Sequence, residues 1–358
     1  MPTHLASLDS LVHPHQMEVQ EFASYALVIA ARSAGAYQED HLPGAVSVPV
    51  AAVPHSTVRE SPAMGAAAPG TDETCPSMPS ALAAHTRRLS AGETVLVYCD
   101  RGGLDSMVWA APLRAAGFRV DVLGGGWINY RRWVSAGLEL LPRVLTFRPL
   151  VAPPVSGLCQ VLEVLTLKGE QVLDLAAMAG QDLVPGLTRQ GDDPPSQAAF
   201  ETALLEAMRR LNPRRPVWIR DGITGLGGLV LPPALRDALR RSKSVTLEVP
   251  LRVRALAWFE RLQAMNTPMT VLLQAFSASP LPPTSQILEQ WRSLANAGQI
   301  TDALAAIIKG YIDPRCAGVP PLATVEVIHL ASLKADAVGA AVNAWLRQNS
   351  SGVPNGTT

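Results

Sequence analysis

The chain has 358 residues, of which 48% are hydrophobic and 17% charged, enough for two or three domains that each bury a core. Its formal net charge is zero, so no overall field draws it to a membrane or to DNA. A nucleic-acid partner would have to meet a local basic patch. Residues 1–11 lack the basic start and apolar run of a signal peptide, and no apolar stretch approaches the ~20 residues of a membrane span.

The cysteines indicate the compartment and exclude two kinds of site. They are scattered with no CxxC spacing, which argues against a zinc site and against a disulfide framework. Together with the missing signal peptide, this pattern predicts a cytoplasmic protein without a bound metal. The four cysteines are Cys75, Cys99, Cys159 and Cys316.

The first part of the chain alternates short apolar strands with helix-forming stretches. Strands are predicted at 26–31, 46–50 and 119–123, and helices at 79–89 and 127–141, the last ending at Pro142. Residues 51–80 are dense in Pro, Gly, Ala and Ser and show no periodicity, which predicts a loop or partly disordered insert.

The centre of this part is the strand 95–98 (VLVY), which ends at Cys99 and is followed by the loop DRGG and a predicted helix at 106–117. In α/β sheets, reactive groups collect where strands lead into helices. Loop amides and the positive end of the helix favour a thiolate or persulfide there, and Gly102 and Gly103 let the loop curl tightly. The alternative is a buried structural cysteine that ends an apolar strand.

The sequence YCDRGG at 98–103 resembles the active-site loop of rhodanese domains, in particular the Cys-x-Arg-Gly-Gly form of tRNA 2-selenouridine synthases. The flanking motifs HLPGA (41–45) and GGW (125–127) occur in the matching order. The resemblance implies that Cys99 is the catalytic nucleophile, with Arg101, Gly102 and Gly103 stabilising its anion.

Two departures from the family pattern surround this loop. The Arg-Ser that follows the glycines in the family is Asp105-Ser106 here, and a nearby carboxylate disfavours a thiolate. Of the Asp-Val-Arg that usually ends the first rhodanese strand, only Arg32 is kept.

A second strand, loop and helix are predicted over 144–167, where the same family carries a P-loop, G-x-x-x-x-G-K followed by Ser or Thr. Gly157 matches the second glycine, but Leu158 replaces the lysine and Cys159 the hydroxyl that binds magnesium. The prolines at 153–154 also lack two N–H donors.

We therefore predict a degenerate P-loop, in which Ser156 and Gly157 at the helix N-terminus bind an anion weakly. The alternative is a purely structural strand, loop and helix.

The resemblance extends over about residues 25–315. PSQAAFE (195–201) matches a family motif, in which Ser196 is predicted to cap a helix. By the same resemblance Ser196, Gln197 and Asp221 are expected to bind substrate, and YIDP (311–314) echoes the family's Tyr-Tyr-Asp-Pro.

Two clusters of basic residues have two interpretations. One lies at 209–215 and the other at 240–243, each around the end of a predicted helix. Cations at helix C-termini ordinarily complement the helix dipole. The other interpretation is a patch that binds the tRNA backbone, with an affinity that falls steeply with salt.

The predicted fold class is α/β. An N-terminal rhodanese-like parallel-sheet domain (1–141) precedes a degenerate P-loop NTPase-like α/β domain (142–254). A helical C-terminal region (255–348) and a disordered tail (349–358) follow.

The leading functional hypothesis is a tRNA 2-selenouridine synthase-like transferase that replaces sulfur by selenium on wobble 2-thiouridine through Cys99. The resemblance implies tRNA as partner, and selenophosphate and geranyl diphosphate as co-substrates, with no tightly bound cofactor. One alternative is a simple rhodanese-type sulfurtransferase. Another is a non-catalytic relative that keeps the fold and binds RNA or protein.

Overall fold

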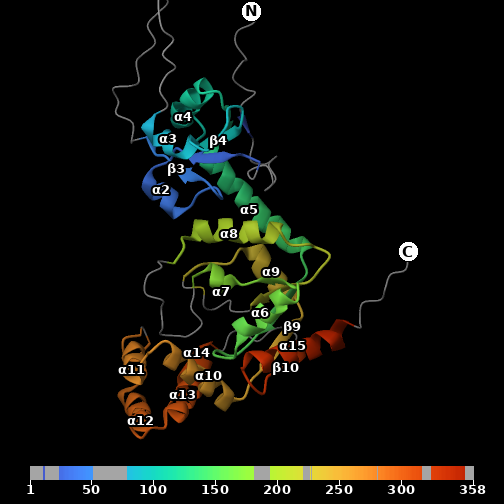
Figure 1. Cartoon of the computed structure of the whole chain (residues 1–358). Coiled ribbons are helices and arrows are strands. Elements are labelled where there is room, and N and C mark those ends of the chain that lie inside the picture. The colour runs from blue at the N-terminus through green and yellow to red at the C-terminus, as the bar shows by residue number, and fades with distance from the viewer. Residues whose placement is uncertain are drawn as a thin grey trace, which may run out of the picture. The chain divides into compact units, whose positions relative to one another are not determined.

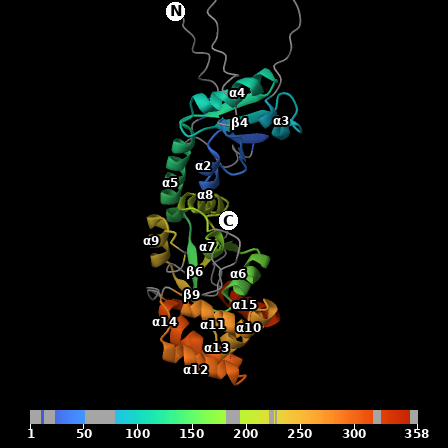
Figure 2. The same ribbon diagram turned by 90° about the vertical axis from the view of Figure 1, so that its left-hand side faces the viewer.

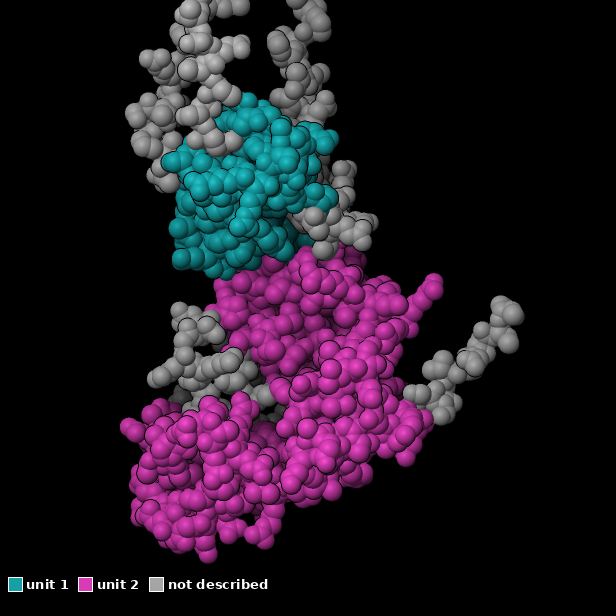
Figure 3. Space-filling view, viewed as in Figure 1, with its two compact units in different colours: residues 1–137 teal, residues 138–358 magenta. Residues whose placement is uncertain are grey.

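The computed structural model describes residues 11–12, 24–50, 79–180, 194–220, 226, 228–279, 281–316 and 324–350. The chain divides into two compact units, 1–137 and 138–358 (Figure 3). Each unit contains its own five-stranded parallel sheet, so the predicted α/β class is confirmed. The domain limits drawn from the sequence, at 141, 254 and 348, stay predictions. Most of the predicted insert (51–78) and most of the predicted tail (351–358) lie outside the described residues.

The sheet of unit 1 has the strand order β1-β5-β4-β2-β3, with every pair parallel. The helices α2, α3, α4 and the start of α5 connect and flank these strands (Figure 1). The elements are β1 (Leu11–Val12), β2 (Leu27–Ala30), α2 (Ala34–Glu39), β3 (Val46–Ser47), α3 (Ser80–Thr86), β4 (Thr94–Tyr98), α4 (Leu104–Ala115), β5 (Arg119–Leu123) and α5 (Gly126–Val144).

The central strand β4 is almost wholly buried because its residues alternate between two covered faces. One face packs Val95, Val97 and Cys99 against the buried side of α4, where Trp109 and Leu113 lie. The indole Nε1 of Trp109 donates to the Val48 carbonyl oxygen at 2.7 Å, so this ring is satisfied as well as packed. The strand that carries Cys99 is therefore a fixed part of the core.

The helix α5 corrects one boundary drawn from the sequence. Pro142 was expected to end the helix, but α5 continues to Val144 with Pro142 inside it. Proline lacks an N–H, so within a helix it forfeits a backbone hydrogen bond. Because Pro142 lies in the last turn, few turns remain to be disturbed, and the helix runs through it.

The sheet of unit 2 has the order β10-β9-β6-β8-β7, again all parallel. Figure 2 shows β6 with α9 on one side and α6 and α15 on the other. The elements are β6 (Phe147–Val151), α6 (Leu158–Leu167), β7 (Gln171–Leu173), α7 (Leu175–Met178), α8 (Gln197–Arg209), β8 (Val217–Arg220), α9 (Pro233–Arg241), β9 (Ser244–Glu248), β10 (Thr324–His329) and α15 (Ala335–Ser350).

Between β9 and β10 the chain forms a group of helices. Their apolar sides meet in one cluster around Trp258, Phe276, Trp291 and Tyr311, whose rings contact one another edge to face. The group consists of α10 (Leu251–Ala264), α11 (Met269–Ser277), α12 (Ser285–Asn296), α13 (Ile300–Ile307), the π-helical turn η5 (Ile308–Ile312) and α14 (Asp313–Cys316).

Two details of the predicted C-terminal region differ from the structure. The region 255–348 was expected to be helical, yet β10 lies within it and pairs with β9. Its sequence, TVEVIH, is rich in β-branched residues, so a local signal for a strand was present. The helix α15 also extends to Ser350, so the prediction of a disordered tail from 349 is wrong at its first two positions.

Glu206 on α8 gives the fold a dependence on pH. Its side chain is nearly buried, and its Oε1 has no hydrogen-bond partner. Burial raises the pKa of this carboxyl, while the charges of Arg209 and Arg210 oppose the rise. The folded protein therefore holds this proton more tightly than the unfolded chain does. Stability from this group is fully present below the unfolded pKa and is lost as pH rises through the folded pKa.

We expect Glu206→Gln to raise the free energy of unfolding relative to the wild type as the pH increases from 4.5 to 8, because the amide cannot ionise. Urea denaturation across this range measures the difference. Glu163→Gln on the exposed side of α6 is the matched control for the loss of one carboxyl group. Parallel pH profiles for Glu206→Gln and the wild type would contradict the expectation.

Candidate active site

Cys99 follows β4 directly and is 3% exposed. The loop of residues 100–103 curls back over it, and the Gly103 N–H donates to Cys99 Sγ at 3.3 Å. Gly103 is also the N-cap of α4, so the sulfur lies against the amide end of that helix. An N–H donor and a helix N-terminus both stabilise negative charge on sulfur. The thiol therefore occupies the position that strand–loop–helix patterning predicts.

The loop keeps its shape by direct packing of backbone on backbone. Gly102 has φ +67°, and a Cβ there would lie 2.5 Å from the Leu123 carbonyl oxygen and 2.7 Å from the Gly126 nitrogen. Gly126 has φ +56°, and a Cβ there would lie 2.3 Å from the Cys99 carbonyl oxygen. The Trp127 N–H donates to that same oxygen at 2.9 Å. The two glycine segments, 102–103 and 124–126, thus form one close contact that only glycine allows.

Arg32 joins three segments around the site. Its Nε donates to Asp100 Oδ1 at 2.7 Å and its Nη1 to the Asp40 carbonyl oxygen at 2.7 Å. Its guanidinium stacks over the Trp127 ring, 4.1 Å from the ring centroid. Arg131 completes the group by pairing with the Asp40 carboxylate. Sequence reasoning noted Arg32 but not these partners, which lie 68 residues away at Asp100 and further on at Trp127.

Two further charged residues lie close to the thiol in sequence, after Asp100, and both are exposed. Arg101 and Asp105 lie on the surface, and neither makes a side-chain hydrogen bond within the described part of the chain. Beside them, Leu104, Met107 and Ile128 are exposed apolar residues at the starts of α4 and α5. The hydrogen bond to Cys99 Sγ therefore comes from a backbone amide and not from either of these side chains.

One polar group at this site was not predicted. The Ser106 hydroxyl, in the first turn of α4, is fully buried and has no hydrogen-bond partner. Burying a hydroxyl without a hydrogen-bond partner lowers the stability of the fold, and this one lies beside the loop. The sequence contained the signal, because Ser106 is the residue of the family's Arg-Ser pair that is kept.

Unit 2 places the predicted degenerate P-loop between β6 and α6. Gly157 has φ +74°, and a Cβ there would lie 2.6 Å from Leu333 Cδ2. Leu158 is 7% exposed and belongs to the apolar cluster that α6 and α15 share with the sheet. A side chain in the position of the phosphate-binding lysine is therefore part of the core. The loop's Ser156 hydroxyl is buried and has no hydrogen-bond partner.

This loop is held by a buried ion pair from the helical group. Arg254 is 4% exposed and pairs with the Asp313 carboxylate through two nitrogens. Its Nε and Nη2 also donate to the Pro154 carbonyl oxygen, at 2.9 and 2.6 Å. Val155 has φ +58°, a conformation in which a β-branched residue is strained. The neighbouring contacts of Arg254 keep the backbone in that conformation.

A different cation lies near the start of α6. Arg220 ends β8 and points to the same face of the sheet as Trp218, which packs in the cluster of α6. Burial lowers the pKa of Arg220, while the negative charges of Asp174 and Cys159 oppose this. Cys159 lies in the first turn of α6, so the guanidinium is close to the helix N-terminus. Arg220 was not among the site residues predicted from the sequence.

Ser196 and Gln197, two of the remaining predicted substrate-binding residues, have structural roles. Ser196 caps α8, because its Oγ accepts from the Ala199 N–H at 3.0 Å. The Gln197 amide exchanges two hydrogen bonds with the backbone of Val230 and donates to Glu201. The cap was predicted and the bonds of Gln197 were not. Asp221 lies outside the described residues. Substrate binding by these three residues stays a prediction.

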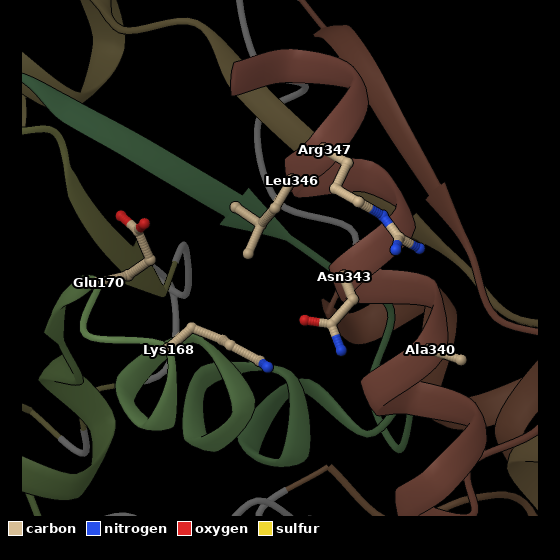
Figure 4. Close-up of a pocket in the computed structure, with 6 residues that line it drawn as sticks. All are labelled: Lys168, Glu170, Ala340, Asn343, Leu346 and Arg347. Atoms are coloured by element: carbon tan, nitrogen blue, oxygen red, sulfur yellow. The ribbon is translucent and has the colours of Figure 1, made fainter. Parts of the chain in front are cut away.

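Within the part of the chain that the structure describes, no three His, Cys, Asp or Glu side chains gather as a metal site would require. An open pocket of about 690 Å³ lies between the end of α6 and α15 (Figure 4). One of its charged groups already has an ion-pair partner within the chain, because Glu170 pairs with Arg215. The pocket is lined by Lys168, Glu170, Ala340, Asn343, Leu346 and Arg347.

The family model described as the rhodanese-like domain matches residues 17–132, which include the Cys99 loop and both glycine segments. The N-terminal unit contains a rhodanese-like domain. Across the described residues, no helix combines the length and the apolar character needed to cross a bilayer.

Several curated relatives carry the name tRNA 2-selenouridine synthase. That of Nitrosomonas europaea is 24% identical over 60% of this chain and 55% of its own length. Those of Shewanella loihica and Hahella chejuensis are 27% and 29% identical over 46% and 44% of this chain, and 44% and 41% of their own lengths. The resemblance predicted from the motifs is confirmed, at the level of a divergent relative. The chain spans about half the length of the curated relatives it matches.

One solved structure is also similar. The BH2092 protein of Bacillus halodurans is 24% identical, with matched segments that cover 32% of this chain and 62% of that one. The TM-score is 0.21. Because this score is low, the assignment of the fold depends on the sheet topology described above and not on this match.

We expect Gly102→Ala to destabilise the rhodanese-like domain by about 2–4 kcal/mol, because its Cβ would meet backbone atoms at a positive φ. Gly103→Ala is the matched control, since a Cβ there has nothing within 4 Å. Its cost should stay within about 1 kcal/mol. Chemical denaturation of the full chain measures both. Equal stabilities for the two variants would contradict the close packing.

Proposed function

We propose that this protein is a sulfur or selenium transferase that acts through Cys99. The observation that carries the proposal is the Gly103 N–H donating to Cys99 Sγ at the N-terminus of α4, within a rhodanese-like domain. The relatives named tRNA 2-selenouridine synthase support the same class of chemistry. Replacement of sulfur by selenium on the wobble 2-thiouridine of tRNA is the specific reaction that we propose, in the cytoplasm and with tRNA as substrate.

The first chemical step needs only unit 1. The Cys99 thiolate attacks the outer sulfur of a donor persulfide, and the donor leaves as its thiolate while Cys99 gains one sulfur atom. The bond that breaks is the sulfur–sulfur bond of the donor, so no oxidant or reductant is consumed. The loop amides, Gly103 first, stabilise the charge on sulfur throughout. Selenium would be transferred in the same way from a donor perselenide, whose sulfur–selenium bond breaks as the donor leaves as its thiolate.

The co-substrates that we propose, selenophosphate and geranyl diphosphate, require an anion site. Its best support is the start of α6, where the buried Ser156 hydroxyl has no hydrogen-bond partner and Arg220 lies close by. Arg220 would supply the charge that Leu158 cannot. Its attraction to Asp174 makes this a weaker site than one built around an unpaired lysine.

We expect Arg220→Gln to weaken the binding of inorganic pyrophosphate by roughly tenfold, the loss of one charge-assisted contact. Calorimetric titration of the full chain measures this. Lys309→Gln, an exposed cation of η5, is the control and should leave the affinity unchanged. No pyrophosphate binding by the wild type would leave unit 2 without the proposed anion site.

The alternative of a simple sulfurtransferase is favoured by the loop of unit 2. Leu158 lies in the core, and the Pro154 carbonyl is already bonded to Arg254. A protein with a working Cys99 and no diphosphate site would transfer sulfur alone. A non-catalytic relative that binds RNA or protein would need neither.

The decisive experiment is nucleoside mass spectrometry of tRNA from cells that lack other selenouridine synthases and receive selenium. We expect selenouridine or geranyl-thiouridine with the wild-type protein and none with Cys99→Ala, while Cys75→Ala serves as a control thiol. Absence of both nucleosides with a folded wild-type protein would overturn the synthase proposal. A persulfide on Cys99 after incubation with thiosulfate, detected as one added sulfur atom, would then establish the simple sulfurtransferase. Its absence would leave the non-catalytic relative.

A further inference from the structure

Unit 2 carries a concentration of positive charge that the proposed chemistry does not use. It comes from two stretches, 209–215 and 240–243, neither of which contains Asp or Glu. The chain as a whole has zero net charge, so this is a local accumulation. We call it the basic rim, and its members are Arg209, Arg210, Arg214, Arg215, Arg240, Arg241 and Lys243.

The topology brings the two stretches to one edge of the sheet. Residues 209–215 lead into β8 and residues 240–243 into β9, so both lie at the amino-terminal edge. β8 and β9 flank β6 on opposite sides. Val217 lies opposite Phe147 and Val245 opposite Leu150, so the two strand starts are roughly 10–15 Å apart. Arginine and lysine side chains can span much of that distance.

The helices that carry the rim also lie on one face. The steps from β7 to β8 and from β8 to β9 cross the sheet in the same direction, and right-handed crossovers place α8 and α9 on the same side. Figure 2 shows α9 on the side of β6 away from α6 and α15. The C-terminal ends of α8 and α9 therefore add to a single surface.

Much of this charge is not neutralised within the chain. Arg214, Arg240, Arg241 and Lys243 are exposed, and their side chains form no ion pair with any described residue. Arg210 approaches Glu206 only at 3.7 Å, and burial favours the neutral form of that carboxyl. Arg215 is the member most engaged with its own fold, since it donates to the Gly169 carbonyl oxygen at 2.6 Å.

Complementing the helix dipole accounts for only part of the rim. That effect acts within the last turn, where Arg209, Arg240 and Arg241 lie. Arg214 and Lys243 lie beyond the helix ends and gain little from it. Exposed arginines and lysines gathered along one edge of a sheet suit a row of phosphates. No aromatic residue occurs in either stretch, which predicts contact with the backbone rather than with bases.

We propose that the basic rim binds the phosphate backbone of a folded RNA, which, resting on the proposed function, is tRNA. This contact depends on the charge and spacing of the phosphates and not on the base sequence of the RNA. It therefore supplies affinity for the substrate from a surface separate from the Cys99 loop of unit 1. Its strength falls steeply with salt, because bound phosphates release counterions.

The test compares two quadruple variants of the full chain. The rim variant replaces Arg214, Arg240, Arg241 and Lys243 by alanine. The control replaces four exposed cations outside the rim, Arg87, Arg88, Lys309 and Lys334, so the net charge of the two variants is equal. None of these side chains makes a hydrogen bond or ion pair with described residues, so both variants should fold. Fluorescence anisotropy with labelled, unmodified tRNA gives Kd over a series of salt concentrations.

We expect the rim variant to bind tRNA at least tenfold more weakly than the control and to lower the slope of log Kd against log salt by roughly 2–4. Equal affinities would overturn the proposal. Binding of polyglutamate but not of tRNA, lost in the rim variant, would assign the rim to an acidic protein and also overturn it. Rim-dependent tRNA binding without any modified nucleoside would support the rim and contradict only the synthase proposal.

Discussion

The site in unit 1 depends on one contact between two glycine segments. Gly102 and Gly126 bring the Cys99 loop and the start of α5 so close that their backbones touch, with both residues at positive φ. That contact lets Trp127 bond to the Cys99 carbonyl and leaves the Gly103 amide facing the sulfur. Any larger side chain at either glycine would separate the two segments. The geometry of the loop, and with it the hydrogen bond from Gly103 to the sulfur, therefore follows from the absence of two Cβ atoms.

Unit 2 has a strand, a loop and a helix where the sequence predicts a degenerate P-loop. The strand, loop and helix are in place, yet the lysine position is occupied by a core leucine and two prolines remove amide donors. Positive charge is still present at the carboxyl edge of the sheet, because Arg220 at the end of β8 lies near the start of α6. Further positive charge lies at the opposite edge, in the basic rim. The positive charge of unit 2 is thus divided between Arg220 at the carboxyl edge of the sheet and the basic rim at the amino edge.

The sequence predicted what depends on local pattern. The α/β class, the strand that ends at Cys99 and the Ser196 cap each depend on a few consecutive residues. Prediction from the sequence failed where a side chain contacts a residue far away in the chain. Arg32 and Asp100 are 68 residues apart, and Arg254 and Pro154 are 100 residues apart. No local sequence pattern predicts either contact. The missed strand β10 is different, because its β-branched sequence was visible and was outweighed by the helical stretches around it.

The ion pair of Arg254 with Asp313 has a consequence for how this loop can change. Because Arg254 fixes the Pro154 carbonyl from the helical group, the conformation of the loop is tied to the packing of that group. Ser156 and Leu158, which follow directly in the chain, are themselves buried. A substitution at Leu158 therefore changes the core of unit 2 as well as the chemistry at the start of α6. Side-chain chemistry and folding are coupled at this point of the chain.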